Sequence, residues 1–167
     1  PQNVMVQRDG SRYLSMLLVD GERTENYKSA EQRGTVSHPW YDSKILGINR
    51  RLTVYTPYGY EANTKTKYPV LYLLHGAGGD EEAWSSMGRT AQILDNLIAK
   101  GLAKPMIVVI PNGNPMAAAA PGDWHAGLYK ASMSGAPNPE TKAKATIPEA
   151  FPDLMKYVES HYRVLKG

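Results

Sequence analysis

A glycine-rich stretch at residues 75–79, with the sequence HGAGG, combines residue types and spacing that could do chemistry. Glycine tolerates positive φ and lets another group approach the backbone closely. The apolar run at residues 68–74 precedes this stretch, and its length predicts a strand that is buried on both faces and central in a parallel sheet. The loop would then present backbone N–H groups at the carboxyl edge of the sheet, where open α/β folds bind ligands.

Two kinds of chemistry use such a loop. Phosphate binding through G-x-G-x-x-G would require glycine where Glu81 stands, and no Gly-Lys-Ser/Thr of a P-loop follows. Acyl transfer in α/β-hydrolases uses an HGGG-type loop after a strand, which donates one N–H group to the oxyanion hole. The HGAGG sequence agrees better with acyl transfer, and a tight turn without chemistry is the alternative.

The composition is that of a globular protein, since 167 residues are enough for one domain with a substantial core. A net charge of +3 from scattered basic residues argues against nucleic-acid binding, and no apolar stretch is long enough to span a membrane. The absence of cysteine excludes disulfides, thiolate metal sites and cysteine nucleophiles. We expect no cofactor and no metal, because a helix N-terminus explains the acidic residues 80–82 more simply. No signal peptide is evident.

The elements that must position this loop follow from periodicity. Residues 50–57 alternate as a strand, residues 106–110 predict a second fully buried strand, and residues 90–100 predict an amphipathic helix between the buried strands. Strand, helix and strand form a right-handed βαβ unit and therefore an α/β sheet. Residues 114–147 have no convincing period, and long loops of this kind are usually functional or disordered. Residues 148–163 are expected to close the chain as a helix, with Pro152 in its first turn and residues 152–163 helical, and Val164 could start another strand.

Residues 1–40 are predicted to form mainly strands. Residues 12–19 are β-capable, residues 22–33 are polar and predict a linker, and residues 34–41 predict one more strand. Pro39 favours an edge position for that strand, because proline cannot donate to a ladder.

Four blocks of sequence carry a family resemblance: YDSKILGINRRLTVYTPYGYE, YPVLYLLHGAGGDEEAW, MIVVIPNGN and PDLMKYVESHYRV. In this order they resemble carbohydrate esterase family 1, which includes feruloyl and acetyl-xylan esterases and is related to antigen-85-type acyltransferases and enterochelin esterases. The resemblance covers residues 34–167 and implies the N-terminal half of an α/β-hydrolase domain, a three-layer α/β/α sandwich. Residues 1–33, with RDGSRYLSMLLVDGE, resemble the last strands of the immunoglobulin-like module that precedes many such domains, plus a linker.

The resemblance implies a serine esterase that removes feruloyl groups from plant cell-wall polysaccharide such as arabinoxylan, with a Ser-His-Asp triad. In the family a G-x-S-x-G nucleophile elbow follows the strand after the closing helix. No serine of this sequence lies in such an elbow, since the nearest match, WSSMG with Ser86, lacks the first glycine and precedes the helix expected at residues 90–100. We expect that the chain stops before its nucleophile, that the missing C-terminal half completes the domain, and that these 167 residues alone are inactive.

The resemblance also implies site residues. It places the first oxyanion donor at the backbone N–H of Ala77, with Gly76 as the alternative. Trp84 and Trp124 could offer flat apolar surface to an aromatic acyl group or a sugar ring, although core packing explains Trp84 equally well.

The other implied contacts and partners follow. Asp123 and His125 lie beside Trp124 and could touch substrate, with a solvated loop as the alternative, while His75 is expected to shape its own loop. The implied partners are feruloylated or acetylated polysaccharide or oligosaccharide, and the implied location is secreted or periplasmic. An acetyl-xylan esterase, a related acyltransferase and a non-catalytic carbohydrate-binding or interaction fragment remain alternatives.

Overall fold

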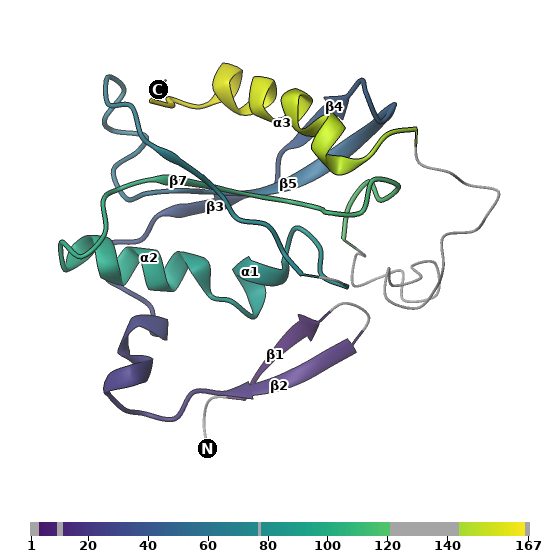
Figure 1. Cartoon of the computed structure of the whole chain (residues 1–167). Coiled ribbons are helices and arrows are strands. Elements are labelled where there is room, and N and C mark those ends of the chain that lie inside the picture. The colour runs from purple at the N-terminus through teal and green to yellow at the C-terminus, as the bar shows by residue number, and fades with distance from the viewer. Residues whose placement is uncertain (1–3, 10–11, 77, 121–143, 166–167) are drawn as a thin grey trace.

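The computed structural model describes residues 4–9, 12–76, 78–120 and 144–165 (Figure 1). In chain order its elements are β1 (Val4–Asp9), β2 (Arg12–Leu17), the 3-10 helix η1 (Glu22–Tyr27), β3 (Thr35–Ser37), β4 (Trp40–Ser43), β5 (Ile48–Thr56), β6 (Val70–Tyr72), α1 (Ala83–Ser86), α2 (Thr90–Ala99), β7 (Ile107–Pro111) and α3 (Ile147–His161).

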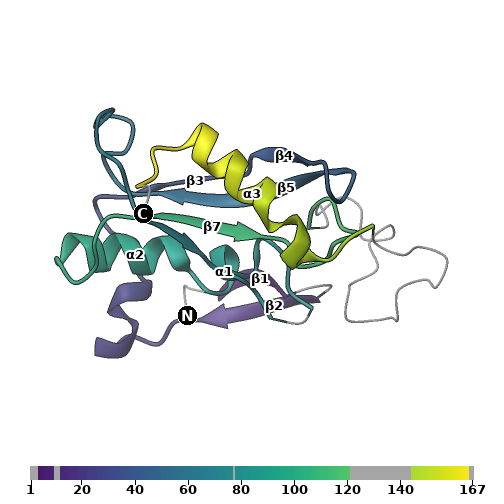
Figure 2. The same cartoon turned by 45° about the horizontal axis from the view of Figure 1, so that its top comes forward.

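A five-stranded mixed sheet forms the centre of the fold, with the order β3-β5-β7-β6 and β4 paired to β5. Strand β5 is antiparallel to β3, β4 and β7, whereas β6 is parallel to β7 with Leu71 opposite Val108. Helix α3 covers one face of the sheet and α2 covers the other, as both views show (Figures 1 and 2). The structure therefore confirms the predicted α/β sandwich of three layers, with a helix between two parallel strands.

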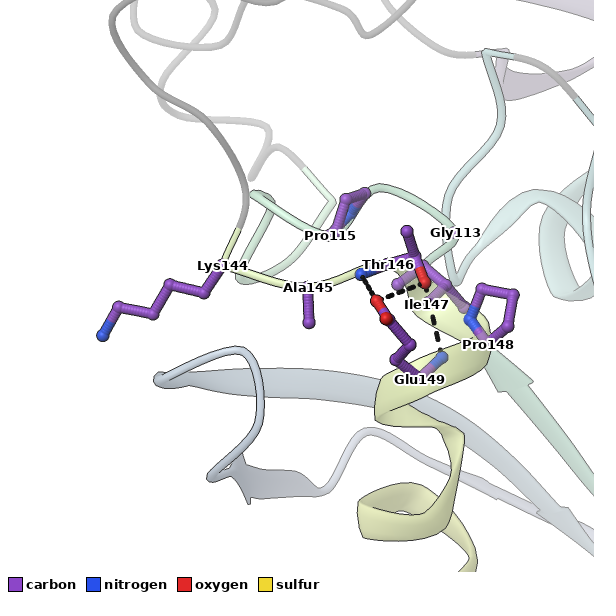
Figure 3. Close-up of a pocket in the computed structure, with 8 residues that line it drawn as sticks. All are labelled: Gly113, Pro115, Lys144, Ala145, Thr146, Ile147, Pro148 and Glu149. Carbon is purple, nitrogen blue, oxygen red and sulfur yellow. Dashed lines mark hydrogen bonds between the residues drawn. The ribbon is translucent and has the colours of Figure 1, made fainter.

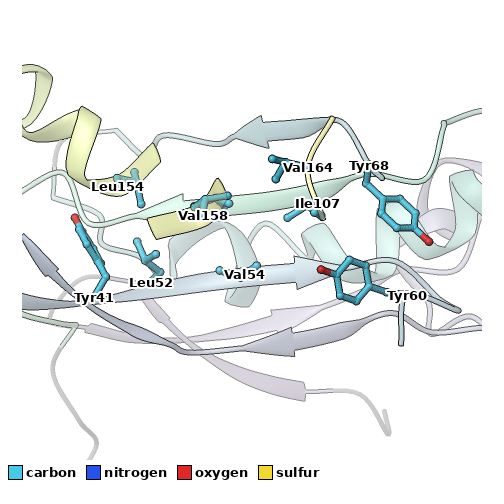
Figure 4. Close-up of a cluster of buried hydrophobic side chains, with 10 residues drawn as sticks. Tyr41, Leu52, Val54, Tyr60, Tyr68, Ile107, Leu154, Val158 and Val164 are labelled. Carbon is cyan, nitrogen blue, oxygen red and sulfur yellow. The ribbon is translucent and has the colours of Figure 1, made fainter. Parts of the chain in front are cut away.

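Strand β7 is buried along its whole length because helices cover both of its faces. Successive side chains of a strand point to opposite faces, so β7 contributes to two separate apolar clusters. The larger cluster, between the sheet and α3 (Figure 4), contains Tyr41, Leu52, Val54, Tyr60, Tyr68, Ile107, Val109, Leu154, Val158 and Val164. The smaller cluster, on the α2 side, contains Tyr55, Leu94, Val108 and Ile110. Full burial of such a side chain contributes about 1.5–3 kcal/mol, so the clusters hold the layers together.

Strand β6 is less buried than the sequence predicts. Leu71 is 42% exposed, and within the part of the chain that the structure describes only β7 pairs with residues 70–72. On the opposite edge, the backbone of Tyr68 bonds to Arg163 and Leu165 and forms a parallel bridge with Val164. Among the described residues a second neighbour is present only at Tyr68, so residues 70–72 are not the central strand buried on both faces that the sequence predicts. The expectation that a strand pairing begins near Val164 is confirmed.

Helix α3 begins at Ile147, one residue before the segment 148–163 that the sequence predicts as the closing helix. Its start is set by a capping box, in which the Thr146 side chain accepts from the Glu149 N–H and the Glu149 carboxylate accepts from the Thr146 N–H at 2.8 Å. Pro148 lies in the first turn, where no intrahelical N–H partner is lost. Placing Pro152 in the first turn was wrong, because this capping box starts the helix earlier and Pro152 lies inside it.

The segment before β4 also differs from the sequence prediction. The structure has two strands, β3 and β4, where one was expected over residues 34–41, because the strand is interrupted at His38 and Pro39. Strand β3 lies at the edge of the sheet, as expected. The segment 22–33, predicted as a linker, contains η1. Three bonds fix η1 and its flank to α2, from Arg89 to the carbonyl oxygen of Tyr27 and from Asn96 to those of Asn26 and Lys28.

Strands β1 and β2 form a separate two-stranded antiparallel sheet. Assigning residues 1–33 to the end of an immunoglobulin-like module remains a prediction. Among the helices that the structure describes, none combines the length and the apolar character needed to cross a bilayer.

Candidate functional site

Two loops meet at the carboxyl edge of β6 and β7. We call residues 75–79 the glycine loop and residues 112–120 the alanine loop. The loops follow parallel neighbouring strands, so both leave the sheet on the same side. The Gly113 N–H donates to Nε2 of His75 at 2.7 Å, which ties the start of one loop to the start of the other. This edge is where the sequence predicted the chemistry.

His75 shapes both loops, as expected from the sequence. Its Nε2 accepts the Gly113 N–H, so the proton of the neutral ring is on Nδ1, which lies 2.7 Å from the Gly76 carbonyl oxygen. The ring also sets the backbone packing, because a Cβ added to Gly79 or to Gly113 would lie 2.9 or 3.0 Å from an imidazole atom. His75 is therefore a structural residue of the site.

The open side of the glycine loop is at Gly76. Gly76 is exposed, a Cβ built there would meet nothing within 4 Å, and its N–H bonds to no other residue that the structure describes. Gly78 has a φ of 80°, a conformation that side chains disfavour. Ala77 lies outside the described residues, so its role as the first oxyanion donor stays a prediction. The geometry around Gly76 leaves room for a group that accepts an N–H bond.

Glu81, two residues after the glycine loop, has a buried carboxylate. Glu81 is 0% exposed; its Oε1 accepts from Arg51 Nε at 2.8 Å and from Ala120 N at 2.7 Å, and its Oε2 accepts from Asn112 Nδ2 at 2.9 Å. Glu82 also accepts from Arg51, at 2.5 Å. Helix α1 begins at Ala83 with Glu82 as its N-cap, so residues 80–82 do form an acidic helix start as the sequence predicts. The sequence did not predict that the carboxylates of Glu81 and Glu82 pair with Arg51 of β5.

Two adjacent arginines of β5 hold the alanine loop. The Arg51 N–H donates to the carbonyl oxygen of Ala118 at 2.8 Å, while Arg50 Nη2 donates to the carbonyl oxygens of Asn112 and Asn114 at 2.6 and 2.9 Å. Arg50 is almost fully buried, and this burial lowers the pKa of its guanidinium, a shift that Tyr41 and Glu81 nearby oppose. The sequence analysis missed both residues. Two consecutive arginines inside a predicted strand were the available signal, because successive side chains point to opposite faces and one of the two must point to a covered face.

Trp84 of α1 is the first aromatic residue after the glycine loop in the sequence. It is 39% exposed, and its indole Nε1 donates to the Leu74 carbonyl oxygen at 2.9 Å. The ring is thus fixed to the chain that enters the loop while part of its surface stays accessible. Leu74 is 56% exposed and adds apolar surface beside it. A role for Trp84 in substrate binding remains a proposal.

A pocket of about 510 Å³ lies between the alanine loop and the start of α3 (Figure 3). Its lining consists of Gly113, Pro115, Lys144, Ala145, Thr146, Ile147, Pro148 and Glu149. The capping box already binds the first N–H groups of the helix (Figure 3), and it lowers the pKa of Glu149 because the Thr146 N–H and hydroxyl donate to the carboxylate. The sequence analysis did not predict this pocket, which is formed by two segments about 30 residues apart in the sequence.

Four further candidates from the sequence are Asp123, Trp124, His125 and Ser86. Asp123, Trp124 and His125 lie outside the described residues, so their predicted substrate contacts stay predictions. Ser86 ends α1, and its hydroxyl donates to the Glu82 carbonyl oxygen at 2.8 Å. Among the described residues, no cluster of three or more histidine and acidic side chains could hold a metal ion.

Known proteins similar in sequence and structure bear on what this site does. Residues 43–167 match the family model "Esterase", described as "Putative esterase". Over 90 residues the chain is 41% identical to an endo-1,4-beta-xylanase/feruloyl esterase of Xylanibacter ruminicola, covering 52% of this chain and 12% of that protein. Over 71 residues it is 44% identical to endo-1,4-beta-xylanase Y of Acetivibrio thermocellus, covering 41% of this chain and 6% of that protein.

Solved structures agree with this match. A CE1 ferulic acid esterase from the anaerobic fungus Anaeromyces mucronatus, in complex with ferulic acid, is similar with a TM-score of 0.61 at 28% identity. The similarity covers 91% of this chain and 53% of that structure. The chain therefore spans about half the length of this structural relative and a much smaller share of the two xylan-degrading relatives.

Proposed function

Since the chain belongs to the esterase family of the α/β-hydrolase fold, we propose that its full-length protein is a serine esterase that removes feruloyl groups from plant cell-wall polysaccharide. The chemistry is acyl transfer through an acyl-enzyme, in which the glycine loop stabilises the oxyanion. In this proposal the serine, the acidic residue and the histidine of the triad lie outside residues 1–167, and the protein acts outside the cell, either secreted or periplasmic.

The observation that carries the proposal is the position of the glycine loop. It follows β6 at the carboxyl edge of the sheet, is anchored by His75 to the alanine loop, and is open at Gly76. Backbone N–H donors at this edge are what an oxyanion hole requires. The partly exposed ring of Trp84 supports a substrate with an aromatic acyl group. Two of the similar proteins are a feruloyl esterase and a ferulic acid esterase, which supports the same substrate class.

The test is a comparison of ester substrates with the natural full-length protein. We expect a higher kcat/KM for methyl ferulate than for p-nitrophenyl acetate, and we expect that a serine-directed phosphonate abolishes both activities. A preference for acetyl esters would indicate an acetyl-xylan esterase in place of a feruloyl esterase. No turnover of either ester, with binding to xylan retained, would indicate a non-catalytic carbohydrate-binding module.

We further propose that residues 1–167 alone do not hydrolyse esters. The sequence contains no G-x-S-x-G, and the hydroxyls of Ser85 and Ser86 both donate to the Glu82 carbonyl oxygen, at 3.0 and 2.8 Å. Among the residues that the structure describes, neither hydroxyl is paired with a histidine that could take its proton. Purified residues 1–167 are therefore expected to hydrolyse p-nitrophenyl acetate at the rate of a buffer blank. Saturable turnover lost in the Ser86→Ala variant would overturn this proposal.

A further inference from the structure

We propose that Glu81 is a positioning residue of the esterase: its carboxylate holds the glycine loop and the alanine loop in one fixed relation. This inference rests on the proposed function, because it concerns how the oxyanion donors of that reaction are kept in place. Glu81 does not touch the predicted oxyanion position itself. It acts through the two backbone segments that meet beside that position.

The bonds of Glu81 connect three separate parts of the chain. Its carboxylate accepts from the Arg51 side chain on β5, from the side-chain amide of Asn112 at the start of the alanine loop, and from the Ala120 N–H at the end of that loop. Asn112 is also buried, and its Oδ1 accepts from the Asn114 N–H at 2.8 Å, which fixes the direction of its amide. One carboxylate therefore fixes both ends of the alanine loop.

The glycine loop is held to the alanine loop at its two ends. At the start, His75 accepts the Gly113 N–H; just beyond the end, Glu81 accepts from Asn112 and Ala120. The N–H groups of Gly76 and Ala77 lie in sequence between these two anchors. Oxyanion donors act only when they are already aimed at the developing charge, and a misplacement of about 1 Å can reduce the rate roughly 100-fold.

Both side-chain oxygens of residue 81 must accept hydrogen bonds, because donors face each of them. A buried carboxylate is costly unless it is paired and hydrogen-bonded, so an apolar side chain would be the simpler choice if packing alone mattered. In Glu81→Gln one oxygen becomes an NH₂ group, which must face either the Asn112 amide or the donors from Arg51 and Ala120. In both orientations donor meets donor, and one anchor of the alanine loop is lost.

The chain provides a matched control in Asp95. This residue of α2 is also a buried carboxylate with two donors, the Tyr55 hydroxyl at 2.7 Å and the Gly34 N–H at 2.8 Å. Its partners lie on β5 and before β3, and none belongs to either loop. Both donors bind Oδ1, so Asp95→Asn removes a buried charge and weakens two charge-assisted hydrogen bonds without perturbing the loops. It separates a positioning effect from the loss of a buried charge and from a general loss of stability.

The experiment compares Glu81→Gln with Asp95→Asn in the full-length protein, assayed on p-nitrophenyl acetate well below the Tm of both variants. We expect both substitutions to lower the Tm. Only Glu81→Gln should lower kcat, roughly 10- to 100-fold, with a KM within about threefold of wild type. A wild-type kcat in folded Glu81→Gln, or an equal loss of kcat in Asp95→Asn, would overturn the proposal.

A rescue variant tests the bond between Glu81 and Asn112 directly. In the double variant Glu81→Gln, Asn112→Asp the direction of this bond is reversed, since the introduced amide donates to the introduced carboxylate. We expect the double variant to have at least fivefold higher kcat than Asn112→Asp alone, in which two carboxylates face each other. This comparison does not depend on recovering folded Glu81→Gln. A double variant no more active than Asn112→Asp alone would contradict the positioning role.

Hydrogen exchange distinguishes failure of this inference from failure of the proposed function. If the wild-type protein hydrolyses no ester, the proposed function fails, and the positioning role is read from amide exchange alone. We expect faster exchange over residues 112–120 in Glu81→Gln than in wild type, with unchanged exchange there in Asp95→Asn. Unchanged exchange over residues 112–120 in Glu81→Gln would overturn the role of Glu81.

Discussion

Replacing Gly34 with alanine should destabilise the domain through a clash of main-chain atoms. A Cβ at Gly34 would lie 2.3 Å from the Thr56 carbonyl oxygen and 2.4 Å from the Tyr55 ring. The carbonyl belongs to the ladder between β3 and β5, where Thr35 pairs with Thr56, so it cannot rotate away as a side chain could. The strain can be relieved only if β3 moves away from β5.

The expected magnitude follows from two costs. Overpacking of a well-packed site typically costs about 1–3 kcal/mol. Moving Gly34 also lengthens the bond from its N–H to the Asp95 carboxylate, 2.8 Å in the structure, and a hydrogen bond to a charged group contributes about 1.5–3 kcal/mol. We therefore expect a loss of about 3–5 kcal/mol in the free energy of unfolding, and a decrease in Tm of at least about 6 °C for a domain of this size.

The assay is differential scanning calorimetry of the purified protein, with Gly21→Ala as the control. A Cβ at Gly21 would meet nothing within 4 Å, so the Tm of that variant should stay within about 2 °C of wild type. A Tm for Gly34→Ala as high as that of Gly21→Ala would refute the reasoning. It would mean that the packing of β3 against Thr56 and Asp95 does not hold this edge of the sheet.

Three further outcomes are expected. Val158→Ala should lower the free energy of unfolding by about 2–3 kcal/mol in denaturant titrations, since Val158 is 0% exposed between α3 and the sheet, whereas Met155→Ala on the exposed side should change it by less than about 0.5 kcal/mol. The capping box lowers the pKa of Glu149, so its stabilisation is present above the ordinary carboxyl pKa and is lost as the pH falls through the lowered value; Glu149→Gln should decrease the Tm at pH 7 and leave it nearly unchanged in strong acid. Ala77→Pro removes a backbone N–H, and in the full-length protein it should reduce kcat by roughly 100- to 1000-fold while ester binding persists; wild-type kcat in a folded variant would contradict the oxyanion assignment.

The sequence predicted the elements whose signals are local. The run at residues 106–110 corresponds to β7 (Ile107–Pro111), and the period over residues 90–100 corresponds to α2 (Thr90–Ala99). A fully buried strand and an amphipathic helix each leave a pattern within about ten residues, which a reader of the sequence can detect. The place of the glycine loop, and the role of His75 in shaping it, followed from the same kind of local reasoning.

Errors in the sequence prediction arose where distant residues compete with local signals. Pro152 looked like a first-turn residue, but the capping box of Thr146 and Glu149 starts the helix earlier. The apolar run at residues 68–74 was predicted to be a central strand of the sheet. The burial of such a strand depends on which segments pair with its two edges, and these segments are distant in sequence. Residues 80–82 do precede helix α1 as predicted, but nothing local indicated that Glu81 and Glu82 pair with Arg51 on another strand.

The sequence by itself determined the family, the α/β class and the loop that is expected to bind the oxyanion, because these depend on motifs and on periods of neighbouring residues. Only the tertiary structure decided what holds that loop in place. Arg51, Glu81 and Asn112 are separated by about 30 residues in each step along the chain, and no pattern within a short window links them. They are in contact because β5, the residues after β6 and the residues after β7 meet at one edge of the sheet. A buried carboxylate is costly unless it is hydrogen-bonded, and these three segments supply the donors.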